Sequence, residues 1–247
     1  MLRLMSYNIR FGGVGRERRL AEVVKQGGAD IVVLQEATRP DVVERLAGLT
    51  NMPHWAAKRG QSVAFMSRLA IERYEWQYHP HTQRAVMAID LASLRIYGVH
   101  LRATHSNYTE RGRMREVRAL LESVRGMGDR FHLLTGDFNT LAPGELLRMQ
   151  KLPVRYRLLA LMLGGRINYR AIQILLNGGY ADCYRRLNSD PGFTFPAWEP
   201  NVRLDYVFVP EQHASRVTAC RVMDDIHEPA RATDHLPLIA EIDDEAV

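Results

Sequence analysis

The chain contains 247 residues, of which 46% are hydrophobic and 25% are charged, a composition that excludes an intrinsically disordered chain and a membrane-spanning protein. No linker or internal repeat divides the sequence, so we expect a single domain over residues 1–247. The formal net charge of +5 favours a polyanionic partner such as nucleic acid or phospholipid head groups.

The cysteines and the N-terminal residues bear on the cellular compartment. Cys183 and Cys220 are far apart in the sequence and form neither a disulfide framework nor a metal-binding spacing, which suits a reducing compartment. The first six residues contain too short an apolar core for a signal peptide, and no apolar run is long enough to span a bilayer. We therefore expect a cytoplasmic protein without a transmembrane segment, and a monomer.

The first two predicted strands both end in polar side chains. Residues 2–7 read as a strand that ends at Asn8, and the glycines that follow force a turn that leaves Asn8 and Arg10 pointing the same way. As an alternative, Asn8 is a turn former and Arg10 a surface charge. The apolar run 31–34 is typical of a buried strand and ends in Glu36, whose charge is costly there unless it is solvated, paired or bound to a metal.

Helices and strands continue to alternate after this point. Helical periodicity predicts helices at 16–26, 41–49 and 109–125, and apolar runs predict strands at 62–66, 85–91 and 94–100. The last two strands form a hairpin, with Arg84 entering the first and His100 leaving the second. A histidine in such a place is more often structural than catalytic.

The stretch from Phe131 to Thr140 is the strongest indication of an enzyme. A short apolar strand ends at a glycine and delivers Asp137 and Asn139 to a sheet edge, on the same side because strand side chains repeat every second residue. A carboxylate and a carboxamide there would meet in one pocket. The alternative is a turn in which both side chains only cap backbone groups.

The C-terminal part begins with an apolar, helix-rich insertion at about 141–180. Two helices are predicted within it, 156–163 and 167–176, with arginines at 155, 157, 166 and 170. They either complete the core or form one wall of a substrate cleft. A strand at 203–209 then carries Asp205 among apolar residues, and Asp234 and His235 immediately precede a last strand at 236–240.

Several strand ends thus present side chains suited to metal and phosphate chemistry. Carboxylate and carboxamide oxygens suit a hard divalent cation such as Mg²⁺ or Mn²⁺, and the absence of clustered cysteines argues against zinc. Two histidines could donate hydrogen bonds to a phosphate. The predicted oxygen ligands are Asn8, Glu36, Asp137, Asn139 and Asp234.

The same residues form an ordered series of motifs. The series is Tyr7-Asn8-Ile9-Arg10, Leu34-Gln35-Glu36, Gly98-Val99-His100, Gly136-Asp137-Phe138-Asn139, Leu204-Asp205-Tyr206-Val207 and Thr233-Asp234-His235. It resembles the endonuclease/exonuclease/phosphatase superfamily, which includes pancreatic-type deoxyribonucleases, apurinic endonucleases, inositol polyphosphate 5-phosphatases and neutral sphingomyelinases. The resemblance covers roughly residues 2–242. It implies an α/β fold, a four-layer α/β/β/α sandwich of two mixed sheets with helices outside.

The resemblance also implies a role for each group that surrounds the metal. Glu36 would hold the catalytic cation, with Asn8 and Asp234 close by. Asp137 would orient or deprotonate the attacking water, and Asn139 would bind a phosphate oxygen or a second metal.

The histidines would act on the phosphate. By the same resemblance, His235 contacts the scissile phosphate and is held by Asp205, which favours its protonated form. His100 would face the other side of the phosphate as a hydrogen-bond donor or acid. Where related nucleases have a glutamate that partners this histidine, Gln61 stands here, and a neutral amide stabilises an imidazolium less well than a carboxylate does.

Arg10 and Arg84 look like phosphate clamps, because pancreatic-type nucleases have an arginine where Arg10 stands. We therefore predict a divalent-metal-dependent phosphodiesterase that acts on nucleic acid, with Mg²⁺ or Mn²⁺ as the cofactor. The alternative enzyme is a phosphatase or a phosphodiesterase of phospholipid or sphingomyelin type, suggested by the apolar insertion. A different class, an inactive binding module of the same fold, requires empty catalytic positions, and every expected position is filled.

Overall fold

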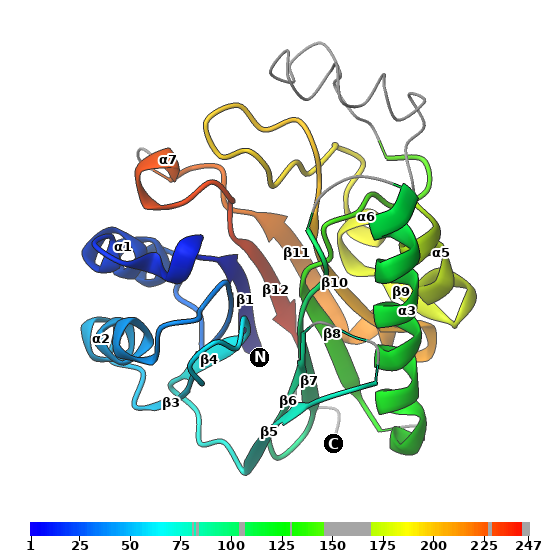
Figure 1. Cartoon of the computed structure of the whole chain (residues 1–247), viewed down its shortest axis with the longest axis horizontal. Helices are drawn as coiled ribbons and strands as arrows, with labels where there is room; N and C mark the ends of the chain where they lie inside the picture. The colour runs from blue at the N-terminus through cyan, green and yellow to red at the C-terminus, as the bar shows by residue number, and fades with distance from the viewer. Residues whose placement is uncertain are drawn as a thin grey trace.

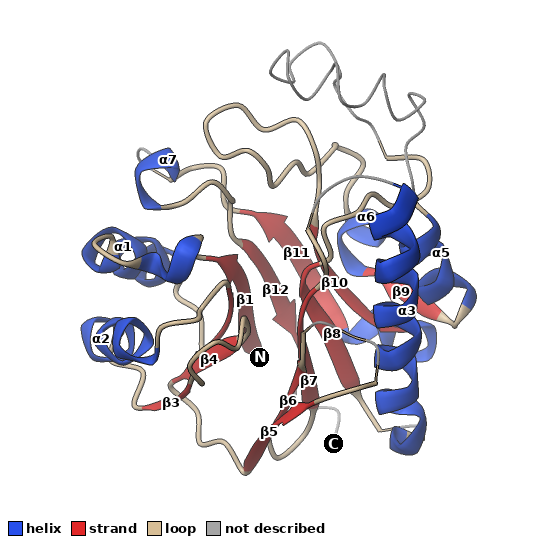
Figure 2. Cartoon of the chain, in the orientation of Figure 1, coloured by secondary structure: helices blue, strands red, loops and turns tan. Residues whose placement is uncertain are grey.

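The computed structural model describes residues 1–80, 82, 84–103, 107–128, 130–145, 169–226 and 229–243. Two six-stranded sheets pack face to face between two layers of helices, as Figures 1 and 2 show. This arrangement confirms the predicted four-layer α/β sandwich of two mixed sheets.

The first sheet has the strand order β11-β12-β1-β2-β4-β3. The β1–β2 pair is parallel and the other pairs are antiparallel. Its strands are β1 (Leu2–Asn8), β2 (Ile31–Gln35), β3 (His54–Ala56), β4 (Ala64–Ser67), β11 (Val217–Val222) and β12 (Leu238–Ile242).

The second sheet has the strand order β5-β6-β7-β8-β10-β9. Only the β7–β8 pair is parallel. Its strands are β5 (Arg73–Gln77), β6 (Val86–Asp90), β7 (Arg95–His100), β8 (His132–Asp137), β9 (Tyr180–Asp182) and β10 (Asp205–Pro210).

Helices cover the outer faces of both sheets. Figure 1 shows α1 and α2 on the side of the first sheet and α3 and α5 on the side of the second. The described helices are α1 (Glu17–Gly27), α2 (Pro40–Thr50), α3 (Asn107–Val124), α5 (Arg170–Asn177), α6 (Cys183–Leu187) and α7 (Pro229–Ala232). Short 3₁₀ turns are η1 (Phe11–Gly13), η2 (Arg125–Met127) and η4 (Glu211–Arg216). None of the helices described is long and apolar enough to cross a bilayer.

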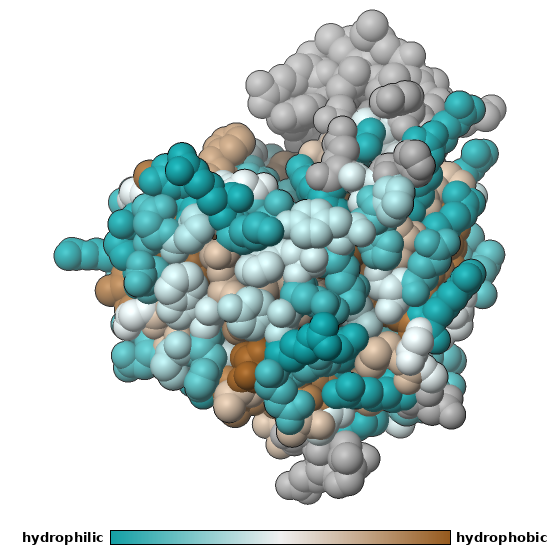
Figure 3. Space-filling model, turned by 60° about the horizontal axis from the view of Figure 1, so that its bottom comes forward, coloured by the Kyte–Doolittle hydropathy of each residue, from teal (hydrophilic) through white to brown (hydrophobic). Residues whose placement is uncertain are grey.

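The core lies in three layers, which explains why the central strands read as continuous apolar runs. Along β1, Leu4 belongs to the cluster between the sheets, and the next residue, Met5, belongs to the cluster under α1 and α2. A third cluster joins the second sheet to α3 and α5 and includes Tyr97 and Leu134. Because both faces of each central strand are buried, alternation of polar and apolar residues is lost. The face shown in Figure 3 is mostly hydrophilic, with hydrophobic residues in small groups.

Within the described residues the predicted strands and helices are present, and their ends differ from our ranges by at most three residues. We predicted no strand where β3, β5, β9 and β11 lie, and these are the four edge strands of the two sheets. The predicted helix 156–163, and the first residues of the helix predicted at 167–176, lie outside the described residues. The described part of the second helix is α5, which packs against α3 and buries Ala171, Ile172 and Leu175 in the cluster shared with α3 and the second sheet.

Candidate active site

Three adjacent strands of the second sheet present acidic and basic groups at one edge. Asp137 ends β8, where it pairs in register with His100 at the end of β7 and with Asp205 at the start of β10. Residues that pair directly across strands point to the same face of a sheet. The strand register therefore places these three side chains in a row, and all three are buried.

The first sheet contributes the opposite wall through β1 and β2. Asn8 ends β1 and pairs with Gln35, the residue before Glu36. The Thr233 hydroxyl donates to the Asn8 carbonyl at 2.9 Å, which brings the turn containing Asp234 and His235 to the same edge. Because the sheets pack face to face, Asn8 Nδ2 reaches across and donates to Asp137 Oδ2 at 3.0 Å.

Asp137 is the central group of the site. Its Oδ2 lies 3.7 Å from His100 Nε2 and 3.8 Å from His235 Nε2. Burial raises the pKa of Asp137 to about 7, although the nearby His235 acts in the opposite direction. A carboxylate with a raised pKa between two imidazoles is an arrangement suited to proton transfer.

His235 is held by Asp205. Its Nδ1 lies 2.9 Å from Asp205 Oδ2, so that Nε2 is directed toward Asp137. Burial alone would lower its pKa, but Asp205, Asp137 and Asp234 together raise the pKa to about 10. This histidine is therefore an imidazolium at neutral pH, with its ring against Phe195 at a centroid distance of 4.9 Å.

His100 is in the opposite electrostatic state. Burial, followed by the charges of Arg84 and His235, lowers its pKa well below the usual value, so the ring is neutral at pH 7. Its Nδ1 lies 2.5 Å from the hydroxyl of Ser62. We expected Gln61 to take this position. The structure corrects that expectation, because Ser62, the next residue in the chain, faces the ring. A neutral hydroxyl at Nδ1 gives no support to a protonated His100.

Asn139 reaches the site by a turn and not by strand alternation, which corrects our reasoning for this residue. β8 ends at Asp137, and Asn139 has a φ of 51°. Its N–H donates to Asp137 Oδ1 at 2.8 Å, and its Nδ2 donates to the Leu101 carbonyl at 3.1 Å. The turn interpretation and the site interpretation therefore both apply, since the turn itself fixes the Asp137 carboxylate.

Backbone strain concentrates around these groups. Of the described non-glycine residues with positive φ, one is Asn51, at the end of α2, and the other four are Arg10, Phe11, Glu36 and Asn139. Such conformations cost on the order of 1–3 kcal/mol each and cluster at functional sites. Glu36 is also fixed by its carboxylate, which accepts from Phe11 N at 2.6 Å and from Asn8 Nδ2 at 3.4 Å.

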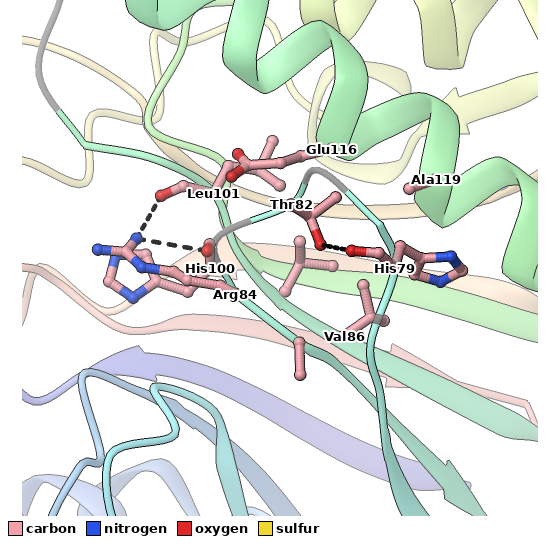
Figure 4. A pocket seen from close by; sticks show the side chains of 10 residues that line it. His79, Thr82, Arg84, Val86, His100, Leu101, Glu116 and Ala119 are labelled. Atoms are coloured by element: carbon pink, nitrogen blue, oxygen red, sulfur yellow. Dashed lines mark hydrogen bonds between the residues drawn. The ribbon is translucent and has the colours of Figure 1, made fainter.

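The two predicted phosphate clamps border the site. Arg10 Nε lies 3.1 Å from Asp234 Oδ2, and the Arg10 side chain is 41% exposed. Arg84 Nη1 donates to the carbonyls of His100, at 3.3 Å, and Leu101, at 2.5 Å (Figure 4). Burial lowers the pKa of Arg84, and the charges of Asp137 and Glu36 partly oppose that effect.

Arg16 is a site residue that the sequence analysis did not identify. Its guanidinium donates to the carbonyl oxygens of Ile9 (2.9 Å), Arg10 and Ala232 (2.5 Å). It therefore ties the loop after β1 to the segment that leads into Asp234. An arginine at the start of an amphipathic helix carries no sequence signal for this role.

The donor set fits a hard divalent cation. Glu36 and Asp234 are only partly buried, and Asn8 links the Glu36 carboxylate to that of Asp137. Ligand atoms of Asp137, Asp205 and His235 also lie within 4.8 Å of one another. We favour the Glu36 side, because His235 Nδ1 and Asp205 Oδ2 are already bonded to each other.

The orientation of Asn8 bears on its expected role as a ligand. Its Oδ1 accepts from Arg10 N at 2.9 Å, while its Nδ2 faces both carboxylates. In this orientation Asn8 positions the acidic groups by donating to them. The Asp205 Oδ1 atom is buried without a hydrogen-bond partner among the described residues, so this site retains unused bonding capacity.

Comparison with known proteins supplies independent findings. The family model described as "Endonuclease/Exonuclease/phosphatase family" matches residues 5–235. No curated protein sequence matches the chain. A search of solved structures also finds similar chains, and three of them, described next, have TM-scores of 0.67 to 0.73 and sequence identities of 16% to 20%.

Three of these structures show which kinds of protein share the fold. A 3′ phosphatase from Neisseria, solved with a product DNA hairpin, has a TM-score of 0.73 and 20% identity, over 98% of this chain and 100% of that one. An AP endonuclease from Archaeoglobus fulgidus has a TM-score of 0.72 and 18% identity, over the same shares. Humanized TDP2 from D. rerio has a TM-score of 0.67 and 16% identity, over 97% of each chain. At these identities the likeness shows the fold.

Proposed function

We propose, since the chain belongs to the Endonuclease/Exonuclease/phosphatase family, that it is a divalent-metal-dependent phosphodiesterase that hydrolyses nucleic acid. The observation that carries the proposal is the place of Asp137, whose Oδ2 lies within 3.8 Å of the Nε2 atoms of both histidines. A water held beside this carboxylate could transfer its proton to Asp137 while an imidazolium stabilises the phosphate.

The other groups divide the remaining tasks. His235, kept protonated by Asp205, would donate from Nε2 to a phosphate oxygen. Neutral His100 would act as a hydrogen-bonding group and not as the acid. Arg10 and Arg84 would neutralise phosphate charge at the border of the site, and Asn139 would support Asp137 and the phosphate.

A cation would be held by Glu36, with Asp234, Asp137 and Asn139 as further oxygen groups. Asn8 would donate hydrogen bonds to two of them, Glu36 and Asp137. When bound, Mg²⁺ or Mn²⁺ supplies charge neutralisation at a phosphate oxygen. The partial burial of Glu36 and Asp234 supports this assignment, because it leaves their oxygens accessible.

Nucleic acid is favoured as the substrate by the net charge of +5 and by the two arginines at the site. The similar structures whose titles name a DNA hairpin and an AP endonuclease agree with this choice. A phospholipid-type substrate was suggested by the apolar insertion, most of which lies outside the described residues.

The test is a panel of substrates with Mg²⁺, with Mn²⁺ and with EDTA. It should include single-stranded and duplex oligonucleotides, an oligonucleotide with a 3′ phosphate, and a short-chain phospholipid. We expect metal-dependent cleavage of oligonucleotides, with an affinity that falls as salt rises by a log-log slope of about −0.9 per duplex phosphate neutralised. Lipid turnover without cleavage of any oligonucleotide would overturn the choice of substrate, and full activity in EDTA would exclude the metal.

A thermal shift measures the cation independently of turnover. Mn²⁺ should raise the Tm of the wild-type protein, because a ligand that binds only the folded state stabilises it by about 2.7 kcal/mol at one hundred times its Kd. Glu36→Gln should lose most of this shift. Glu211→Gln, at a glutamate whose side chain is 64% exposed, is the matched control and should keep it.

A further inference from the structure

Two exposed aromatic rings stand beside the site. Phe11 is 77% exposed and Trp198 is 56% exposed. We call these two residues the aromatic rim. Each is connected to a different group of the site: Phe11 to Glu36 through its backbone, and Trp198 to His235 through Phe195.

Phe11 adjoins the acidic side of the site. Its backbone N–H donates to Glu36 Oε2 at 2.6 Å, and the Arg10 guanidinium lies over its ring at 5.1 Å from the centroid. Its φ of 50° is a strained conformation for a bulky residue. Burial of the ring does not offset this strain, because the ring is exposed. A small residue would suit the turn better, which indicates that the ring has another use.

Trp198 adjoins the histidine side. Its ring meets Phe195 edge-on at 6.4 Å, and Phe195 packs on His235 at 4.9 Å. The loop is attached to the site by its backbone, since Ala197 N donates to the Asp234 carbonyl at 2.8 Å. Trp198 is therefore held one ring beyond the imidazolium that we assign to the phosphate, with more than half of its own surface in solvent.

We propose that the aromatic rim stacks on the nucleobases that flank the scissile phosphate, so that the preferred substrate is a nucleic acid with unpaired bases at the cut. This inference rests on the proposed function. Bases next to a bound phosphate lie within a few ångströms of it, and every base offers a flat face to a ring. In a continuous duplex those faces are covered by neighbouring base pairs, and an aromatic ring reaches them only where the strand is single or frayed.

Charge favours a base over an acyl chain as the occupant. The ring of Phe11 lies directly beside the Arg10 guanidinium, which pairs with Asp234. Trp198 adjoins Phe195, which packs on His235. Charged groups of the site therefore lie between the two rings. An acyl chain would have to cross these charged groups. A nucleotide presents a phosphate to them and a base to each ring.

The test uses short oligonucleotides with one cleavable phosphodiester, in which the nucleotide on either side carries a base or is replaced by a base-free spacer. Trp198→Ala and Phe11→Ala should each lower kcat/KM on the base-bearing single strand by about 5- to 150-fold, the range measured for loss of one stacked base. On the substrate that lacks the corresponding base, the same variants should cleave at nearly the wild-type rate. Trp198→Tyr should retain most of the activity, and Trp198→Leu should not, because only a ring stacks.

The matched control is Tyr74→Ala, an exposed ring at 47% on the edge strand β5. It should cleave all substrates as the wild type does. Equal losses on base-bearing and base-free substrates, or faster cleavage of a blunt duplex than of a single strand, would overturn the proposal. So would a loss of binding to phosphatidylglycerol vesicles in Trp198→Ala with oligonucleotide cleavage intact, since the rim would then contact lipid. If the wild type cleaves no oligonucleotide at all, the proposed function fails first.

Discussion

Arg203 and Asp205 are two residues apart and almost fully buried, at 0% and 1% exposure, but they belong to two very different charged clusters. Arg203 bonds Asp182 through Nη1 at 2.9 Å and Glu145 through Nη2 at 2.6 Å, and its guanidinium lies 4.4 Å from the Tyr206 ring centroid. Arg185 adds a second cation on Glu145 at 3.1 Å. In this cluster two cations match two carboxylates.

Around Asp205 the charges are not matched in this way. Asp205 and Asp137 share one imidazolium, His235, which bonds the first at 2.9 Å and lies 3.8 Å from the second. Asp205 Oδ1 and Arg203 Nε each lack a hydrogen-bond partner among the described residues, so the two clusters differ in their balance of charge and not in unpartnered atoms. Burial raises the pKa of Asp137 to about 7, whereas Asp182 and Glu145 raise the pKa of Arg203 against the lowering effect of its burial. The comparison teaches that balanced buried charges stabilise the fold, whereas the unbalanced negative charge at the site leaves it able to bind a cation.

The largest effect should come from breaking the unmatched cluster. Asp137→Asn keeps the shape but removes the proton acceptor, and His235→Ala removes a donor to the phosphate. Each should lower kcat at least about 10²-fold, the usual scale for one acid, base or charge-stabilising group. Single-turnover assays on the best oligonucleotide, with circular dichroism to verify folding, measure this. Near-normal turnover in either folded variant would contradict the assigned roles.

Breaking the matched cluster should instead reduce stability. Arg203→Met leaves Asp182 and Glu145 buried with fewer partners, and removal of one member of a buried pair costs about 3–5 kcal/mol. Urea unfolding should show this loss. Adding Asp182→Asn should recover part of it, because the amide removes an unpaired charge and can still cap α6 at the Arg185 N–H. An unchanged free energy of unfolding in Arg203→Met would mean that the cluster is not a stabilising one.

A third experiment contrasts the two clusters through pH. In the metal-free protein, Asp137→Asn should raise the free energy of unfolding, and the gain should grow between about pH 4 and pH 7. The unfolded chain releases this proton near pH 3.9, whereas the folded wild type holds it to about pH 7 because burial raises the pKa of Asp137. The wild type therefore loses stability across that window, by roughly 1–3 kcal/mol.

Unfolding in EDTA at several pH values measures the gain. Asp41→Asn, on α2, serves as the control, because Arg39 lowers the pKa of Asp41 and its loss should bring no gain in that window. If Asp137→Asn destabilises the protein at every pH, the negative charge of Asp137 is fully balanced in the folded protein, and the comparison between the two clusters is wrong.

The smallest effect is expected at the surface. Arg186 and Glu211 pair at 3.4 Å with side chains that are 46% and 64% exposed. Arg186→Ala should change the free energy of unfolding by less than about 1 kcal/mol, since solvent screens such pairs. A loss of stability as large as that of Arg203→Met would mean that burial does not determine how much an ion pair contributes to stability.

Much of the fold and of the site follows from the sequence alone. The central strands are buried on both faces, so they read as apolar runs, and three of these runs are followed closely by polar residues of the site, Asn8, Glu36 and Asp137. The ordered motifs then identified the superfamily. These features are local in the chain, which is why the sequence alone was enough to predict them.

The edge strands could not be predicted in this way. β3, β5, β9 and β11 each bond to a single neighbour. β5 has no fully buried residue, and β3 and β9 are only three residues long, so these segments carry too little hydrophobic pattern to indicate a strand. Only the tertiary structure shows that these segments pair with the outer strands of the two sheets.

The partners within the site were also decided by the tertiary structure. Ser62 and not Gln61 meets His100, Arg16 joins two loops more than 200 residues apart, and Asn139 reaches Asp137 through a turn. Phe11 and Trp198 have no shared motif, yet both stand beside the site. Such contacts depend on strand register and on how the two sheets pack, because these bring together residues from distant parts of the chain. The sequence determined which chemical groups stand at the strand ends, and the packing of the sheets decided which of them touch.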